Sequence, residues 1–306
     1  MTKKGQPSRP LTRGPSSRRS VLLVAAVAAI LVVSVAWAAS RRAGSDAAGQ
    51  LEALAGQEDP GIAHVHGLGV DPADGTLYAA THYGLFRIPD SGTPARVANR
   101  LQDTMGFTIT GPRQFLGSGH PDLREDLPSR LGLIESTDGG ESWQQLSLAG
   151  KADFHALHSA HGNVYGYDSG GGFMVTADKK TWETRSSLEM RDFAVSPTDA
   201  KTIIATTESG LQRSNDGGRT FAAVPAAPTL VVLGWDRSNE LYGAAPGGEV
   251  YRSPDAGSTW EQLSRLDGQP EAFVASGDRL LAATASGIYE STDGARSWRL
   301  RFREQR

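Results

Sequence analysis

Short runs of alternating apolar and polar residues recur from residue 64 to residue 303, separated by turns rich in Gly, Asp, Ser and Pro. The first unit contains three such runs, His66–Val70, Leu77–Thr81 and Gly84–Arg87. Alternation with a period of two predicts short strands, and four strands per unit are typical of a propeller blade. We therefore predict an all-β, six-bladed β-propeller over residues 62–306. Its blades are expected to start near His64, Asp103, Asp153, Glu189, Thr229 and Gln269.

An eight-residue motif returns once per unit, after the third predicted strand. It reads STDGGESW at residues 136–143 and recurs at residues 214–221, 253–260 and 291–298, with a shorter copy at 176–182 and a degenerate one around Asp90. Ser and Asp side chains bond to nearby backbone N–H groups, and Gly permits a positive φ, so the motif predicts a hairpin turn. A structural role is therefore expected for its aspartates, Asp138, Asp178, Asp216, Asp255 and Asp293.

The N-terminal segment predicts export. Residues 1–20 are basic and are expected to stay in the cytoplasm, residues 21–39 carry no charge and are long enough to cross a bilayer, and residues 40–61 read as a flexible linker. A retained signal anchor and a cleaved signal peptide both fit, with cleavage after Ala38 in the second case. The pair Arg18–Arg19 also leaves twin-arginine export open beside the general route. We expect a single-pass membrane protein with the propeller outside, or a secreted protein after cleavage.

Charge and composition narrow the function classes. The first 42 residues hold eight of the 31 basic residues and no acid, so the remainder carries 23 basic and 34 acidic side chains, a net charge of −11. An acidic globular part argues against nucleic acid as a partner. The chain has no Cys, which excludes disulfides and thiolate metal sites.

Aligning the units on one another gathers polar residues of the first three blades at one rim of the propeller. The start of the first strand and the end of the second strand meet there, because adjacent strands are antiparallel. Imidazole and carboxylate ligands suit Zn or Cu, and a Met would favour Cu. The predicted metal ligands are His64, His66, His82, His120, His155, Met105 and Asp153.

Two other residue groups complete this picture of the rim. His158 and His161 fall outside the pattern and are expected to be ordinary loop residues. The insertion at residues 117–130 follows the second strand of blade two, and we expect it to cover the histidine cluster.

Two further functions compete with metal binding. A glycoside hydrolase would use rim carboxylates, Asp103 and Asp153, as its acid and base or nucleophile, with a glycan at the propeller axis. A non-catalytic assembly module would use the same rim to bind an envelope protein and would need no cofactor. The tetrapeptide Phe86–Pro89 matches a sialidase motif by letter, but it falls on a third strand and therefore does not predict sialidase chemistry.

The repeats resemble the Asp-box, or BNR, repeat of sialidases and related propellers over residues 64–303. The whole chain is also similar to a group of short bacterial Asp-box propellers that are often labelled glycosyl hydrolase or exo-alpha-sialidase. The stretches that carry this resemblance include HVHGLGVDP at 64–72, DTMGF at 103–107 and DFHAL at 153–157. The resemblance implies the propeller fold and export, and it implies a glycoside hydrolase if the chain is an enzyme.

Overall fold

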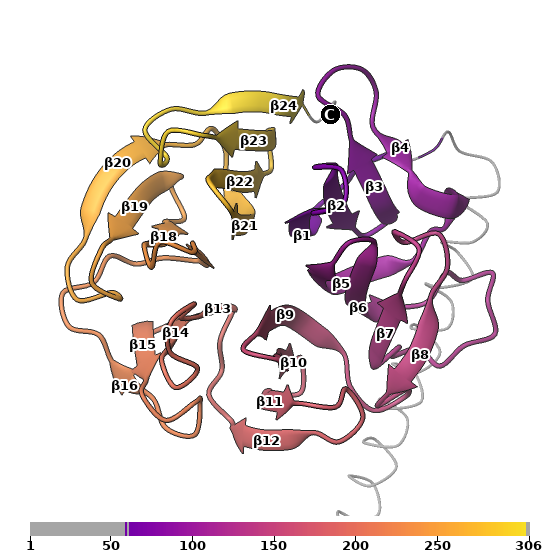
Figure 1. The fold of residues 1–306 in the computed structure, drawn as a ribbon, viewed down its shortest axis with the longest axis horizontal. Coiled ribbons are helices and arrows are strands. Elements are labelled where there is room, and N and C mark those ends of the chain that lie inside the picture. The colour runs from indigo at the N-terminus through magenta and orange to yellow at the C-terminus, as the bar shows by residue number, and fades with distance from the viewer. Residues whose placement is uncertain (1–58, 60, 304–306) are drawn as a thin grey trace, which may run out of the picture. The chain divides into compact units, whose positions relative to one another are not determined.

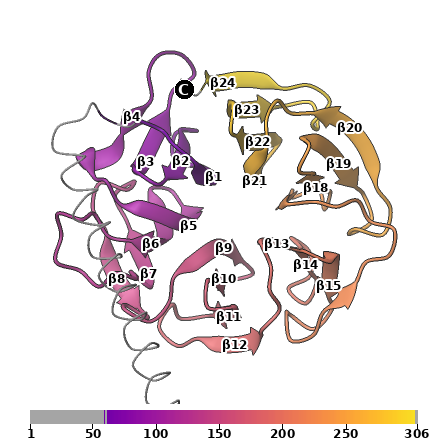
Figure 2. The same ribbon diagram turned by 180° about the vertical axis from the view of Figure 1, so that it is seen from behind.

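A computed structural model of the protein describes residue 59 and residues 61–303, which form a ring of six four-stranded antiparallel sheets (Figures 1 and 2). Each sheet is built from four consecutive strands, so no described strand is exchanged between blades where the ring closes. This confirms the prediction of an all-β, six-bladed propeller. The basic tail, the apolar segment 21–39 and most of the linker lie outside the described residues. Within the described residues, no helix is long and apolar enough to cross a membrane.

The strands of successive blades occupy equivalent places. The innermost strands are β1 (Val65–Val70), β5 (Asp103–Gly111), β9 (Phe154–Ala160), β13 (Asp192–Val195), β17 (Val232–Trp235) and β21 (Pro270–Ser276). The second strands are β2 (Leu77–Thr81), β6 (Gln114–His120), β10 (Asn163–Asp168), β14 (Ile203–Thr207), β18 (Leu241–Ala244) and β22 (Arg279–Thr284). The third strands are β3 (Gly84–Ile88), β7 (Leu133–Ser136), β11 (Gly172–Thr176), β15 (Gly210–Ser214), β19 (Glu249–Ser253) and β23 (Gly287–Ser291). The outer strands are β4 (Ala95–Arg96), β8 (Gln144–Ser147), β12 (Glu183–Ser186), β16 (Ala222–Ala223), β20 (Glu261–Arg265) and β24 (Arg299–Arg303), and a short 3₁₀ helix (Val97–Asn99) follows β4.

The hydrophobic core lies between the blades. Six clusters of buried apolar side chains fill the six interfaces between neighbouring sheets of the described ring. Inner strands of neighbouring blades approach closely where one of them carries a glycine. At Gly106 in β5, an added Cβ would lie only 2.5 Å from the carbonyl oxygen of Phe154 in the next blade. Burial of apolar surface between whole sheets therefore holds the ring together.

Blade six meets blade one without a strand shared between them among the described residues. Leu281 and Ile288 of blade six share a buried cluster with Leu77 and Phe86 of blade one, and β1 lies beside β21 in both views (Figures 1 and 2). The turn after β3 adds an ion pair across this interface, because Asp90 contacts the Arg301 guanidinium at 2.7 Å. The degenerate motif around Asp90 thus supports ring closure.

The eight-residue motif forms the turn between the third and fourth strands, on the rim opposite the start of the inner strands. In blade four, Ser214 Oγ accepts the Gly218 N–H at 2.8 Å and donates to Asp216 Oδ1 at 2.8 Å. Asp216 in turn accepts the N–H groups of Arg219 and Thr220. The same network surrounds Asp138, Asp255 and Asp293, and a shortened version surrounds Asp178.

Candidate functional site

The inner strands of four blades carry a β-bulge near their first residues. The strand register shifts by one residue at His66, Met105, His155 and Glu271, so that two residues of the inner strand face one residue of the second strand. A bulge breaks the simple alternation of side chains and re-aims the extra residue. All four bulge residues line the cavity at the propeller axis.

Two predicted metal ligands, His66 and His82, converge with Asp103, which the sequence predicts only as a carboxylate of the glycoside hydrolase alternative, at the interface between blades one and two. His66 comes from the bulge of β1, His82 follows the end of β2, and Asp103 opens β5. His82 Nδ1 lies 3.2 Å from His66 Nε2 and 3.1 Å from Asp103 Oδ1, and His66 Nε2 lies 3.6 Å from the same Oδ1. Within the described residues, this trio is a group of His and acidic side chains compact enough to hold a metal ion.

The trio cannot satisfy itself by hydrogen bonds. A ring nitrogen carries at most one proton, so His82 Nδ1 cannot donate to both His66 and Asp103. Burial, and then the neighbouring His82, lower the pKa of His66 to about 3, so its imidazole is neutral at physiological pH. His66 Nε2, His82 Nδ1 and Asp103 Oδ1 together therefore offer more lone pairs than N–H donors.

His64 lies beside the trio but has a different partner. Its Nδ1 contacts Glu271 Oε1 of blade six at 3.0 Å, and its ring is stacked at 5.4 Å from His82. The hydrogen bond to Glu271 raises the pKa of His64, and the contact joins blade one to blade six where the ring closes. The backbone of His64 has φ of 35°, a conformation that costs a non-glycine residue energy. His64 thus borders the trio, but its Nδ1 contacts Glu271 and not the trio.

The remaining predicted ligands gather one blade further on. His120 ends β6, Asp153 immediately precedes β9, and His155 is the bulge residue of β9. Asp153 Oδ2 lies 3.0 Å from His155 Nε2 and 3.6 Å from His120 Nε2. Burial opposes ionisation of Asp153, but the hydrogen bond from His155 and the nearby imidazoles lower the pKa of its carboxyl overall. Alignment of the repeats on one another placed all the predicted ligands on one rim. The structure places His66 and His82 in one group and His120, Asp153 and His155 in another, while Met105 lines the cavity and belongs to neither group.

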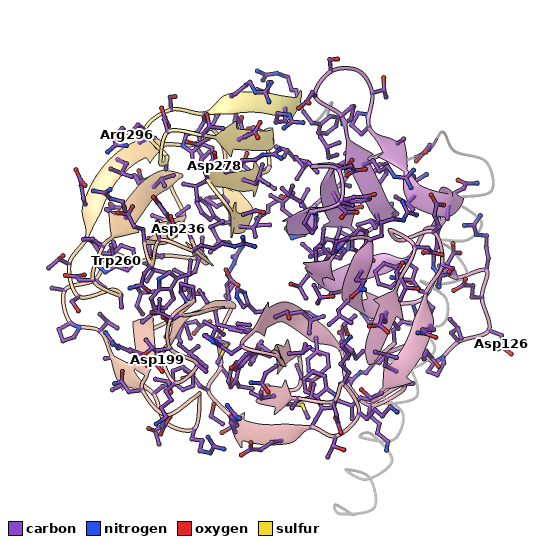
Figure 3. The ribbon with its side chains drawn as sticks, in the orientation of Figure 1. Asp126, Asp199, Asp236, Trp260, Asp278 and Arg296 are labelled. Carbon is purple, nitrogen blue, oxygen red and sulfur yellow. The ribbon has the colours of Figure 1, made fainter. Side chains whose placement is uncertain are left out.

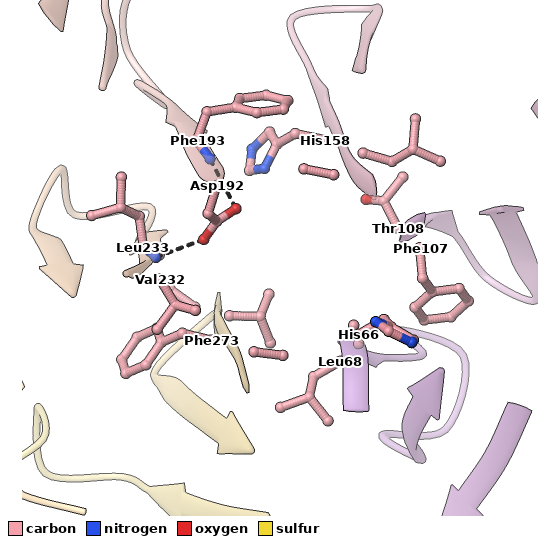
Figure 4. A pocket seen from close by; sticks show the side chains of 18 of the residues that line it. His66, Leu68, Phe107, Thr108, His158, Asp192, Phe193, Val232, Leu233 and Phe273 are labelled. Carbon is pink, nitrogen blue, oxygen red and sulfur yellow. Dashed lines mark hydrogen bonds between the residues drawn. The ribbon is translucent and has the colours of Figure 1, made fainter. Parts of the chain in front are cut away.

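A cavity of about 660 Å³ follows the propeller axis below this rim and is lined by all six blades (Figure 4). Each inner strand contributes one large apolar side chain to the lining: Leu68, Phe107, Leu157, Phe193, Leu233 and Phe273. Polar side chains, among them Thr108, His158 and Asp192, lie between them (Figure 4). The volume lies within the range of roughly 300–1,000 Å³ that is usual for small-molecule sites.

Sequence reasoning missed two residues of this cavity. Asp192 accepts the N–H groups of Phe193 and Leu233 and so links blades four and five, while burial raises the pKa of its carboxyl to about 6. Trp235 is buried, lines the cavity and has an indole N–H without a hydrogen-bond partner among the residues that the structure describes. The repeat pattern does not predict the role of either residue, because Asp192 and Trp235 make contacts across the interface of blades four and five.

Two expectations about the rim need correction. His158 is not a loop residue but belongs to β9 and lines the cavity, since the bulge at His155 shifts the later residues of that strand. The insertion begins after His120, because Gly117–His120 are part of β6. Its residue Asp126 lies at the outer edge of the ring (Figure 3), whereas the carbonyl oxygen of Ser129 lies 2.7 Å from His120 Nδ1, so only part of the insertion borders the histidines.

Two other expectations are confirmed. His161 is a turn residue, and its Nε2 donates to the Ser196 carbonyl at 2.7 Å. Arg87 lies on β3, where it bonds to Tyr78 and pairs with Glu141, away from the axis. The sialidase-like tetrapeptide therefore has no place in the site.

Comparisons with known proteins agree with the fold. No protein family profile matches the chain. A xyloglucanase of Hypocrea jecorina (strain QM6a) is 31% identical over 147 residues, a match that covers 43% of this chain and 17% of the xyloglucanase. The chain is thus homologous to part of a glycoside hydrolase and spans less than a fifth of it.

Two solved structures show the same fold at lower identity. An ancestral GH74 enzyme has a TM-score of 0.51 and 15% identity, covering 76% of this chain and 37% of the other. YCF48 bound to a D1 peptide has a TM-score of 0.50 and 19% identity, covering 80% of this chain and 82% of the other. At these identities the likeness establishes the propeller fold alone.

Proposed function

We propose that this protein binds a first-row transition metal, Zn or Cu, through His66, His82 and Asp103 at the mouth of the axial cavity. The observation that carries the proposal is the triangle formed by the three ligand atoms, with edges of 3.1, 3.2 and 3.6 Å. Metal–nitrogen and metal–oxygen bonds of about 2.0–2.2 Å in a tetrahedral site separate neighbouring ligand atoms by about 3.3–3.6 Å. An ion bound by all three would need only small movements of the side chains.

The chemistry of the trio supports the same function. Two imidazoles and one carboxylate are a ligand set that suits Zn and Cu. A bound ion would also resolve the shortage of donors, because each ligand atom would offer it a lone pair. The cavity below the site leaves room for a small ligand at a further coordination position, so we propose metal or small-ligand binding as the activity of the rim.

A glycoside hydrolase is the second candidate, and the sequence match to a xyloglucanase favours it. Under this proposal Asp103 and Asp153 would be the catalytic carboxylates. A general acid needs a raised pKa, whereas the pKa of Asp153 is lowered and the carboxylates of both residues contact imidazoles. The geometry thus supports metal binding better than glycan hydrolysis.

We further propose that the repeats are Asp-boxes and that the propeller is exported and anchored by residues 21–39. The hydrogen bonds around Asp138, Asp216, Asp255 and Asp293 support the first statement. The uncharged run after a basic tail supports the second. A reporter fused after Arg306 should be active only outside the cytoplasm, and cytoplasmic activity would contradict export.

Calorimetric titration of the metal-stripped full chain with Zn²⁺ and Cu²⁺ tests the main proposal. His66→Ala and His82→Ala should each weaken uptake by more than about 100-fold, since loss of even an outer-shell partner costs about 10–100-fold. His161→Ala is the matched control, because that imidazole bonds to Ser196 in a distant turn, and it should leave uptake unchanged. Absence of uptake, with turnover of a β-glucan that Asp103→Asn abolishes, would favour the glycoside hydrolase. Absence of both, with binding of an envelope protein, would favour an assembly module.

A further inference from the structure

Arg191 places a positive charge at the mouth of the axial cavity. It immediately precedes β13 and occupies the place in blade four that the bulge residues occupy in blades one, two, three and six, two residues before the large apolar lining residue. Its side chain is exposed and lines the cavity, and its Nη2 donates to the carbonyl oxygen of Pro270 in blade six at 3.3 Å. Because blade five lies between these two blades, the guanidinium extends across the mouth.

The acidic side chains of the cavity lining are already satisfied by other donors. Each carboxylate oxygen of Asp192 accepts one backbone N–H group, and the two oxygens of Glu271 contact His64 and the backbone N–H of Val65. Among the described residues, the guanidinium of Arg191 has no ion pair and forms only the bond to the carbonyl of blade six. Most of its N–H donors therefore remain available to a ligand, and an anion would balance its charge.

His158 adds a second polar group without a partner. It lies on β9, and Figure 4 shows its ring beside Phe193 at the edge of the cavity. Within the described part of the chain, the ring contacts Phe193 and its nitrogens form no hydrogen bond. Burial, and then the neighbouring His161, lower the pKa of His158 to about 4, so its ring is neutral at physiological pH. The imidazole therefore offers one N–H donor and one acceptor to a ligand.

The large apolar side chains of the lining suit the body of an organic molecule. They include the aromatic rings of Phe107, Phe193 and Phe273, each from the inner strand of a different blade. Burial of apolar surface against such rings stabilises a complex, and an inorganic anion would gain nothing from it. The lining therefore favours a ligand with both a charged end and an apolar body.

We propose that the axial cavity binds a small organic carboxylate with an apolar body, whose carboxylate group pairs with Arg191 and whose body lies among the apolar side chains within reach of His158. The planar fork of a guanidinium matches the two oxygens of a carboxylate, so the pair can form two parallel hydrogen bonds. The proposal rests on the proposed function, because it names the class of small ligand that the rim would bind. It does not require the metal ion, since neither Arg191 nor His158 belongs to the trio.

Calorimetric titration of the metal-stripped full chain with phenylacetate and with hexanoate tests the proposal. We expect both acids to bind, and 2-phenylethanol, which keeps the ring but lacks the charge, to bind at least about 10-fold more weakly than phenylacetate. Arg191→Gln should weaken binding of the acids about 10–150-fold, the loss expected for a hydrogen bond to a charged group. His158→Phe keeps a ring but removes its nitrogens, and it should weaken binding about 2–12-fold.

Arg265→Gln is the matched control. Arg265 ends the outer strand β20 and pairs with Glu249, so this variant should bind both acids as the natural protein does. Arg237→Gln tests the other end of the cavity, because Arg237 also lines it but follows the end of β17. Thermal melting confirms that each variant is folded.

The possible results separate this proposal from the metal site. No binding of either acid, or equal binding by Arg191→Gln and the natural protein, would overturn it. A larger loss from Arg237→Gln than from Arg191→Gln would overturn the assignment of the carboxylate to Arg191, and inorganic phosphate binding as tightly as the acids would overturn the apolar body. Zn²⁺ uptake without binding of the acids would leave the proposed metal site standing, whereas binding of the acids without Zn²⁺ uptake would support this proposal and overturn the metal site.

Discussion

Replacement of Ser214 by Ala should destabilise the propeller more than replacement of the neighbouring Asp216, although the aspartate is the more prominent residue of the motif. Ser214 is 0% exposed, and its hydroxyl accepts the buried Gly218 N–H at 2.8 Å. Alanine leaves that N–H without a partner and out of reach of water. The cost of such an unpaired buried group is about 1–3 kcal/mol.

Asp216 differs because the N–H groups that it accepts, those of Arg219 and Thr220, are exposed. Water can replace the carboxylate there, so Asp216→Ala should have a clearly smaller effect. For a domain of this size, 1–3 kcal/mol corresponds to a fall in melting temperature of about 2–12 °C. Thermal and urea unfolding of both variants beside the natural protein measures the difference. Equal destabilisation by Asp216→Ala and Ser214→Ala would show that burial of the accepted N–H group does not decide the loss of stability.

Two further predictions concern acid stability and blade packing. Burial alone would raise the pKa of Glu290, but three arginines, including Arg301, lower it to about 2 from its ordinary value of 4.5. Since the pKa of Glu290 is lower in the folded than in the unfolded protein, the ionised carboxylate stabilises the fold above about pH 4.5, and this stabilisation is lost as the pH falls toward 2. Glu290→Gln should therefore reduce the change in unfolding free energy between about pH 4.5 and 2. The same pH dependence in the variant and the natural protein would contradict this role of Glu290. Gly106→Ala should cost about 1–3 kcal/mol, because its Cβ would meet the backbone of Phe154. Gly172→Ala, whose nearest neighbour would be 3.7 Å away, is the control in the same unfolding assay, and equal losses would argue against a clash.

Blade number was predictable because the turn motif is local. Each copy satisfies its own backbone through a Ser or Thr and an Asp two residues later, so Asp138, Asp178, Asp216, Asp255 and Asp293 mark five blades, and the degenerate copy around Asp90 marks the first. These features depend on residues close together in the chain.

The geometry of the rim was less predictable because it depends on register between strands. A bulge at His66, Met105 or His155 is decided by pairing with the second strand, and the alternation of apolar residues gives no sign of it. The expectation that His158 lies in a loop was wrong for this reason. The division of the histidines into two groups likewise depends on contacts between blades, such as that of His82 with Asp103, which no local pattern reports.

A crystal structure of the zinc-loaded protein, with anomalous diffraction measured on both sides of the zinc absorption edge, tests the proposed metal site directly. We predict an anomalous peak within about 2.0–2.2 Å of His66 Nε2, His82 Nδ1 and Asp103 Oδ1. A map without a peak at these atoms, or with zinc bound only elsewhere on the surface, would contradict it.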